Sequence, residues 1–309
     1  MSINYKGESS IEIDMNQPLL HVMIPVYGDS PYLEETLNSV VKHLPNDLPV
    51  TVVEDPSNSQ ELAKTLNKFK ERIKHVVNSE RLGVAGNFNK CAQLSSGIYT
   101  QIIGSDDTFL NNPVPSITRL MNDKDVPTVL IPKAKVISNK RIFNLTDLFK
   151  SFVKPKVVRD RRVSSSQFAR SILIGDWPYF PAIIWNTEFL LRNPFSEKLE
   201  SAMDLDLFVR MIGTKFTVIY LNKFTISYRR HEESQSTKLS LNGNRFIEEL
   251  ACHSKAVNIA RTKGLKTEKL LAKIALSVRL HAFWKGITLI YKNPTLSMKL
   301  VTISLKSIK

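Results

Sequence analysis

Two adjacent carboxylates, Asp106 and Asp107, follow a short apolar stretch and the turn Gly104-Ser105. No Lys or Arg stands next to them in the sequence. Like charges at this range raise each other's pKa unless a metal ion or a ligand neutralises them. The pair therefore indicates a cation site, with a solvated Asp-Asp turn after a strand as the alternative interpretation.

A second acid pair, Glu54-Asp55, also follows an apolar stretch, and the chain around both pairs alternates between expected strands and helices. Its patterns predict strands over 19–26, 49–53, 73–78 and 98–103, and helices over 32–43, 60–72 and 83–95. Such alternation is typical of a parallel, doubly wound sheet, which binds ligands beyond the carboxyl ends of its strands. Both acid pairs are therefore expected on one rim. No GxGxxG or GxxxxGK[ST] sequence follows the first strand, so neither a dinucleotide site nor a P-loop is supported.

A third acid, Asp204, lies at the expected start of a helix. Leu205, Phe208 and Val209 have helical spacing, which places Asp204 in the first turn, where the helix dipole favours a carboxylate. The alternative interpretation is an ordinary N-terminal charge with Asp206 as its exposed neighbour. Further on, strands are expected over 216–220 and 225–228, and helices over 246–263, 267–291 and 296–308.

Residues 19–109 resemble the nucleotide-binding half of the family 2 glycosyltransferases, which have the GT-A fold. The resemblance rests on four segments in this order: Ile24-Pro-Val-Tyr27, Val52-Val-Glu-Asp55, Glu80-Arg-Leu-Gly-Val84 before a helix containing Asn89, and Ile103-Gly-Ser-Asp-Asp107. The last segment takes the place of the family's DxD motif. Many members have Asp at its first position, where this chain has Gly104, so the metal and ribose contacts fall to Asp106 and Asp107.

The resemblance implies an α/β protein with a Rossmann-related, mostly parallel central sheet flanked by helices. It also implies an inverting enzyme that moves a sugar from a nucleoside-diphosphate sugar to a hydroxyl of a glycan or lipid-linked acceptor, in surface polysaccharide or cell-envelope synthesis. A divalent ion, Mn²⁺ or Mg²⁺, is the implied cofactor. The rival classes are a sugar nucleotidyltransferase and a non-catalytic protein that binds membrane or nucleic acid on the same fold.

The resemblance also assigns roles to residues. Asp204 is the expected catalytic base, and Met203 stands before it where the family has Glu. The other expected site residues are Pro25, Tyr27, Glu54, Asp55, Arg81 and Asp106 for the nucleotide, Asp106, Asp107 and His231 for the metal, Arg229 and Arg230 for the diphosphate, and Trp177, Tyr179 and Met203 for the acceptor. Arginine suits the diphosphate because its planar fork matches phosphate oxygens. Trp177 and Tyr179 present rigid faces suited to sugar rings, although both are also ordinary core residues.

Charge is unevenly spread over the 309 residues, whose net charge is +14. The segment 261–309 carries +10 and the segment 133–163 carries +8, so the remainder is slightly acidic. The basic C-terminal helices interleave Lys with Phe283 and Trp284, a pattern typical of helices that lie on an anionic membrane; a helix packed on its own domain is the alternative. Nucleic acid is not an expected partner, since an acid-lined rim without a metal would repel phosphate.

The sequence begins without a basic, apolar leader and holds no long uncharged apolar run, so we expect a cytoplasmic protein, peripheral at the inner face of the plasma membrane. Cys91 and Cys252 are expected to be core residues. The expected organisation is an N-terminal extension 1–17, a GT-A catalytic domain 18–236 and a basic helical extension 237–309. Within the catalytic domain, 18–112 is the nucleotide-sugar half and 113–236 the acceptor half.

Overall fold

The computed structural model describes residues 2–5, 8–12, 17–121, 128–138, 154–231, 239 and 242–308. Its strands are β1 Ser2–Tyr5, β2 Glu8–Glu12, β3 Leu20–Tyr27, β4 Val50–Asp55, β5 Lys74–Val77, β6 Tyr99–Ile102, β7 Thr108–Phe109, β8 Val129–Ser138, β9 Arg161–Val163, β10 Ile184–Asn186 and β11 Val218–Arg230. Its helices are α1 Leu33–His43, α2 Gln60–Lys68, α3 Gly83–Leu94, α4 Val114–Leu120, α6 Ser165–Ile174, α7 Thr187–Arg192, α8 Met203–Arg210, α10 Asn244–Thr262, α11 Lys266–Ile274, α12 Leu276–Leu289 and α13 Pro294–Leu305, with a 3-10 turn η1 at Phe180–Ala182.

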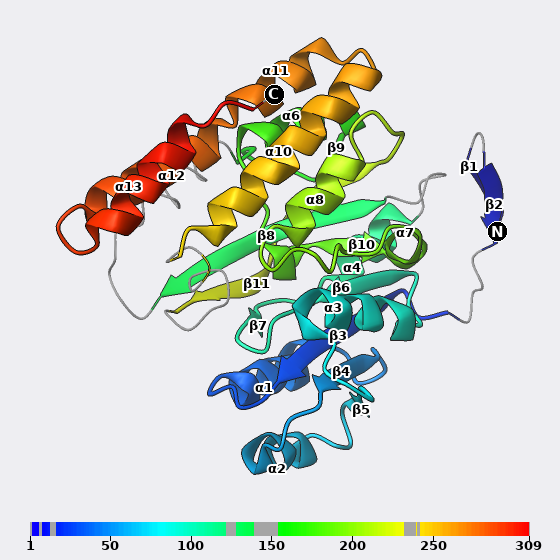
Figure 1. The fold of residues 1–309 in the computed structure, drawn as a ribbon. Coiled ribbons are helices and arrows are strands. Elements are labelled where there is room, and N and C mark those ends of the chain that lie inside the picture. Colours follow the sequence, from blue (N-terminus) through cyan, green and yellow to red (C-terminus); the bar gives the residue numbers. More distant parts are fainter. Residues whose placement is uncertain are drawn as a thin grey trace.

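One large sheet forms the centre of the molecule (Figure 1), with the strand order β5-β4-β3-β6-β10-β8-β11-β7. The short strand β9 pairs with the first residues of β11, Val218 to Tyr220. The four strands from β5 to β6 are parallel, because a helix returns the chain between each pair that follows in sequence. The second half is mixed: β10 runs antiparallel to both of its neighbours, and β11 is parallel to β8. The expected α/β class is thus confirmed.

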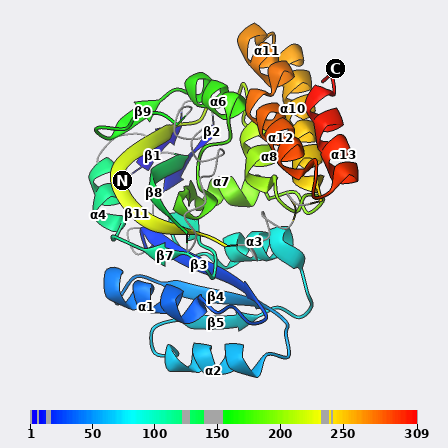
Figure 2. The ribbon, with the colours of Figure 1, turned by 90° about the vertical axis from the view of Figure 1, so that its left-hand side faces the viewer.

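The sheet separates two hydrophobic cores, and β3 contributes to both. Val22 and Ile24 point into the core that α1 covers, whereas Met23 points into the core that contains α3, α6 and α8. This explains the continuous apolar run of β3, because a strand covered on both faces has no polar side. Helices on both sides of the sheet are visible in Figure 2.

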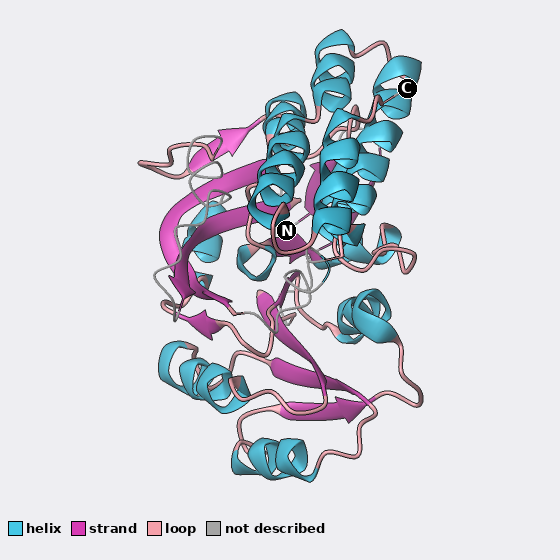
Figure 3. Cartoon of the chain, turned by 60° about the vertical axis from the view of Figure 1, so that its left-hand side comes forward, coloured by secondary structure: helices cyan, strands magenta, loops and turns pink. Residues whose placement is uncertain are grey.

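The C-terminal helices lie together near the C-terminus of the chain (Figure 3), and they pack against the rest of the protein to different extents. From α10 and α11, Cys252, Ala256, Val257 and Ala272 enter the larger core, while α12 and α13 form a small separate cluster around Phe246 at the start of α10. Cys91 and Cys252 are free and buried, as expected. No helix in the described part of the chain is long and apolar enough to span a membrane.

Two expected elements differ from the structure. The strands expected at 216–220 and 225–228 are one strand, β11, which is continuous through an irregular register against β8 between Tyr220 and Ile226. The helix expected over 267–291 is two helices, because Ala275 adopts a left-handed conformation with φ 45°. Of the basic segment 133–163, residues 139–153 lie outside the described residues.

Candidate active site

A short antiparallel ladder positions the acid turn. β7 pairs with β11 so that Thr108 lies opposite Ser227 and Phe109 opposite Ile226. Just beyond the ladder, the backbone N–H of Arg229 donates to Asp107 Oδ1 at 2.9 Å, and Arg229 Nε donates to the Asp106 carbonyl at 3.0 Å. The turn 104–107 is thereby fixed against the carboxyl end of β11.

The structure brings Asp106 and His231 together, although they are far apart in the sequence. Asp106 Oδ2 lies 2.7 Å from His231 Nε2, and both side chains are partly exposed. The ring of Tyr32, at the start of α1, lies 5.0 Å from the imidazole. A Cβ at Gly104 would lie 2.4 Å from Asp106 Oδ1, so a larger residue at this position would require that carboxylate to move.

Asp107 has an unusual electrostatic environment. Burial raises its pKa well above the ordinary value, and the neighbouring Asp106 charge raises it further. A bound cation would relieve both effects, so the pair fits a divalent ion that prefers carboxylate oxygens. Among the described residues no group of three or more His, Cys, Asp or Glu side chains is arranged to hold a metal ion, so phosphate oxygens and water would have to complete the coordination.

Arg229 is occupied by protein groups rather than turned outward. Its guanidinium pairs with Glu35 at 2.6 Å and lies 4.5 Å over the Tyr32 ring, and the side chain is buried. It therefore braces the acid turn from α1. Arg230 is half-buried and lies 5.9 Å over the ring of Tyr228.

The acids at the end of β4 also have internal partners. Asp55 is buried and accepts hydrogen bonds from Asn78 Nδ2 at 2.9 Å and from the backbone N–H groups of Leu82 and Gly83 at 3.1 and 2.9 Å. Its carboxylate thus stabilises the N-terminus of α3. Glu54 accepts from Ser57 at 3.0 Å and lies 2.9 Å from His75 Nε2. Both carboxylates therefore have their hydrogen-bond partners within the protein.

The side chains of Tyr27 and Arg81 form an exposed cation–π pair on this rim. The Arg81 guanidinium lies 4.0 Å over the Tyr27 ring, and Tyr27 is 53% exposed at the last position of β3. Pro25 precedes it in the same strand and is half-buried. A flat stack at the carboxyl end of a parallel strand suits the face of an aromatic ligand ring.

Asp204 lies in the first turn of α8, as predicted, and is half-buried, with Oδ1 accepting the backbone N–H of Leu205 at 2.9 Å. Asp206 is not its exposed neighbour. It is 4% exposed, because Arg210 Nε and Lys255 Nζ donate to its two oxygens at 2.9 and 2.7 Å. Asp204 is therefore the carboxylate of this helix that can meet solvent or a ligand.

Glu248 of α10 holds the backbone just before Asp204. Its carboxylate accepts the N–H groups of Glu200, Ser201 and Ala202 at 3.0, 2.9 and 3.1 Å, and also the Ser201 hydroxyl at 2.8 Å. Glu248 could not be expected from the sequence, because its hydrogen-bond partners lie more than forty residues away and leave no local pattern. For the same reason the sequence did not indicate Glu35 and Tyr32, which contact Arg229.

The aromatic segment proposed for the acceptor divides between core and surface. Trp177 is 2% exposed, packs against Tyr220 at 5.2 Å between ring centroids and donates to Ser171 Oγ, so its ring is a core group. Met203 is buried in the same core. Tyr179 is partly exposed, and its ring packs in a tilted arrangement against Tyr228, with 4.9 Å between the ring centroids, next to the arginines of β11.

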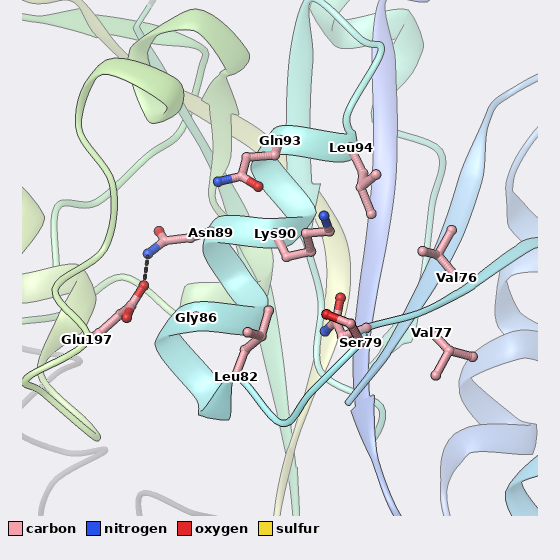
Figure 4. Close-up of a pocket in the computed structure, with 11 residues that line it drawn as sticks. Val76, Val77, Ser79, Leu82, Gly86, Asn89, Lys90, Gln93, Leu94 and Glu197 are labelled. Carbon is pink, nitrogen blue, oxygen red and sulfur yellow. Dashed lines mark hydrogen bonds between the residues drawn. The ribbon is translucent and has the colours of Figure 1, made fainter. Parts of the chain in front are cut away.

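A cavity of about 500 Å³ lies beside this rim, between α3 and the edge strand β5 (Figure 4). Val77 and Ser79 line one wall, and Gly86, Asn89 and Glu197 line the other, with Asn89 donating to Glu197 at 3.3 Å. The cavity also includes Asn78 and Leu82, which bind Asp55. None of its lining residues belongs to the acid turn.

Comparisons with known proteins agree with this fold. Residues 21–172 match the family model described as "Glycosyl transferase family 2". An uncharacterized glycosyltransferase of Methanocaldococcus jannaschii, MJ1057, is 21% identical over 221 residues, which cover 70% of this chain and 72% of that protein. The fold is similar to that of S. aureus TarS in complex with UDP-GlcNAc, with a TM-score of 0.66 and 18% identity over 94% of this chain and 81% of the other.

It is also similar to the mannosyltransferase PcManGT from Pyrobaculum calidifontis in complex with GDP-Man and Mn²⁺, with a TM-score of 0.51 and 14% identity over 94% of this chain and 85% of the other. These matches define the class: the protein is a glycosyltransferase of GT-A fold. The segment that matches the family 2 model, 21–172, includes the acid turn and the Tyr27–Arg81 stack.

Proposed function

We propose that this glycosyltransferase is an inverting, divalent-metal-dependent enzyme that uses a nucleoside-diphosphate sugar as donor. The observation that carries the proposal is the acid turn itself, where Asp106 faces His231 and Asp107 has a raised pKa, at the carboxyl edge of the sheet. The TarS structure contains UDP-GlcNAc, and the PcManGT structure contains GDP-Man and Mn²⁺. These ligands support the same assignment.

The donor would be held by groups from three segments. The Tyr27–Arg81 stack would receive the nucleobase, because an aromatic ring and a guanidinium both offer flat faces. Arg230 and His231 would meet the diphosphate, and Arg229 would hold the turn in place from its contacts with Glu35 and Asp106.

Asp106 and Asp107 would hold Mn²⁺ or Mg²⁺ together with phosphate oxygens of the donor. When bound, such an ion neutralises charge on the departing diphosphate. His231 would lie beside the bound ion, since its Nε2 already contacts the Asp106 carboxylate.

Asp204 would act as the general base. Its position in the first turn of α8 favours the ionised carboxylate, which takes the proton from an acceptor hydroxyl as that oxygen attacks the anomeric carbon opposite the diphosphate. One displacement inverts the centre, whereas retention needs a second carboxylate as nucleophile. Asp206, the nearest acid in the chain, is committed to Arg210 and Lys255. The acceptor would be a glycan or lipid-linked hydroxyl, reached by a protein peripheral at the inner face of the plasma membrane.

The test is a screen of nucleotide sugars for transfer and hydrolysis, with Mn²⁺, with Mg²⁺ and with a chelator. The Asp106→Asn variant should lose metal-dependent donor turnover, and Asp204→Asn should keep donor binding but lose transfer by roughly 10² to 10⁴, the usual contribution of a general base. The matched control is Glu61→Gln, an exposed carboxylate on α2. A protein that turns over and binds no donor in a metal-dependent way would contradict the proposal.

A further inference from the structure

The outer side of α12 carries a row of large apolar side chains. Five of them are 42% to 47% exposed and are spaced so that they lie on one side of the helix: Leu276, Leu280, Phe283, Trp284 and Ile287. Ile290 and Tyr291, in the turn that follows α12, are 51% and 96% exposed and extend this set. We call this set the α12 face. A contiguous exposed apolar row of this kind marks an interaction surface more often than an ordinary monomer surface.

The inner side of α12 is already packed. Val278 and Ala282 are buried with Leu300 and Ile303 of α13. Gly286 allows the two helices to approach closely, since a Cβ there would lie 3.0 Å from Val301 Cγ2. The α12 face is therefore a second apolar side of a helix whose core side is satisfied, and within the described residues it packs into none of the three buried clusters.

The charged residues of the segment that contains the α12 face are almost all basic. The segment 261–309 holds a single acid, Glu268, which is buried and paired with Arg170 at 2.9 Å. Basic side chains of the same helices, among them Lys273, Lys292 and Lys299, are exposed. The C-terminal helices therefore combine exposed apolar groups with an excess of exposed basic side chains.

We propose that the α12 face lies on an anionic membrane, with its apolar side chains at the boundary between head groups and acyl chains and the lysines on lipid phosphates. A helix with this composition binds in the interface plane rather than across the bilayer. A second copy of the chain fits less well, because a symmetric contact would place lysines against lysines without an acid between them.

A membrane contact of this kind would bring the enzyme to a lipid-linked acceptor, as the proposed function requires. The contact itself depends only on the side chains of the C-terminal helices and not on the reaction. Figures 1 and 2 show α12 and α13 together at one end of the helical layer, outside the central sheet. Vesicle binding can therefore be measured without donor, so that its failure and the failure of glycosyl transfer are distinguishable.

The chain contains its own reporter. Trp177 and Trp185 are 2% and 0% exposed, whereas Trp284 in the α12 face is 47% exposed, so a change in tryptophan emission on binding reports Trp284. The full chain is titrated with vesicles of phosphatidylcholine alone and of equal parts phosphatidylcholine and phosphatidylglycerol. We expect a blue shift and co-sedimentation with the anionic vesicles, weakened by high salt because exposed charges are screened.

The double variant Phe283→Glu with Ile287→Glu keeps Trp284 and should weaken binding to anionic vesicles about tenfold or more, because it puts acids into the apolar row. Leu191→Glu on α7, where the native side chain is 50% exposed, is the control and should bind like the unaltered protein. Circular dichroism checks that each variant is folded. Unchanged binding of the folded double variant would overturn the proposal, as would a blue shift that depends on protein concentration and not on vesicles, which would indicate a second copy.

Discussion

Glu248 offers a direct test of how the catalytic helix is held. Its carboxylate accepts three backbone N–H groups from 200–202 and the Ser201 hydroxyl, all just before Asp204. A hydrogen bond to a charged group contributes about 1.5–3 kcal/mol, but water can replace part of this at a half-buried site. We therefore expect Glu248→Ala to lower the free energy of unfolding by about 2 kcal/mol.

The same geometry predicts a graded effect. Glu248 Oε2 accepts three of the four hydrogen bonds, so Glu248→Gln can keep those three through its carbonyl and lose the bond from Glu200 N–H. Urea unfolding and transfer kinetics should rank the proteins as wild type, Gln variant, Ala variant. The positioning role predicts that kcat falls, by about tenfold for Glu248→Ala, while the KM for donor stays unchanged, because Glu248 acts through the loop that carries Asp204.

The matched control is Glu61→Ala, which removes an exposed carboxylate on α2 and should change neither stability nor kcat. A folded Glu248→Ala protein with unchanged kcat would refute the positioning role, even if its stability were reduced.

Three further predictions concern residues with buried partners. Burial lowers the pKa of His21 to about 4, so the unfolded chain binds more protons below pH 6.5, and stability should fall by up to about 3 kcal/mol between pH 7 and pH 4. Urea midpoints against pH test this, and a non-titrating His21→Gln variant should give a shallower dependence. Asp55→Ala removes the acceptor of two backbone N–H groups at the start of α3 and should cost about 3 kcal/mol in thermal or urea unfolding, whereas a cost below 1 kcal/mol would contradict the capping role. Arg229→Lys keeps the charge but loses the planar contact with Tyr32, and the Mn²⁺ concentration for half-maximal activity should rise about tenfold; an unchanged metal titration would argue against bracing.

Local patterns predicted the first half of the fold well. The strands that became β3, β4, β5 and β6 are short apolar runs between helices with clear spacing, and a parallel sheet follows from that order. The breaks in later elements were not predictable in the same way. Nothing in the composition near Ala275 marks its left-handed conformation, and an irregular register keeps β11 continuous through a segment that looks like a turn.

The site, like the fold, was predictable only in part. The resemblance to the family 2 glycosyltransferases assigned Asp106 and His231 to one metal site, and the structure gives them a 2.7 Å contact. The sequence did not indicate which acids are used internally. Asp55 and Asp206 look like free carboxylates in the sequence, but their partners come from other segments, 23 to 49 residues away for Asn78 and Lys255. Such pairings depend on tertiary packing.

The most direct test of the proposed donor site is calorimetric titration of UDP and GDP into the full chain, with and without Mn²⁺. We expect one of the two nucleotides to bind more tightly in the presence of Mn²⁺, and we expect Asp106→Asn to abolish this effect of the metal while Glu61→Gln preserves it. Equal binding with and without Mn²⁺, or an unchanged metal effect in Asp106→Asn, would contradict the central claim that the acid turn beside His231 is the metal and diphosphate site.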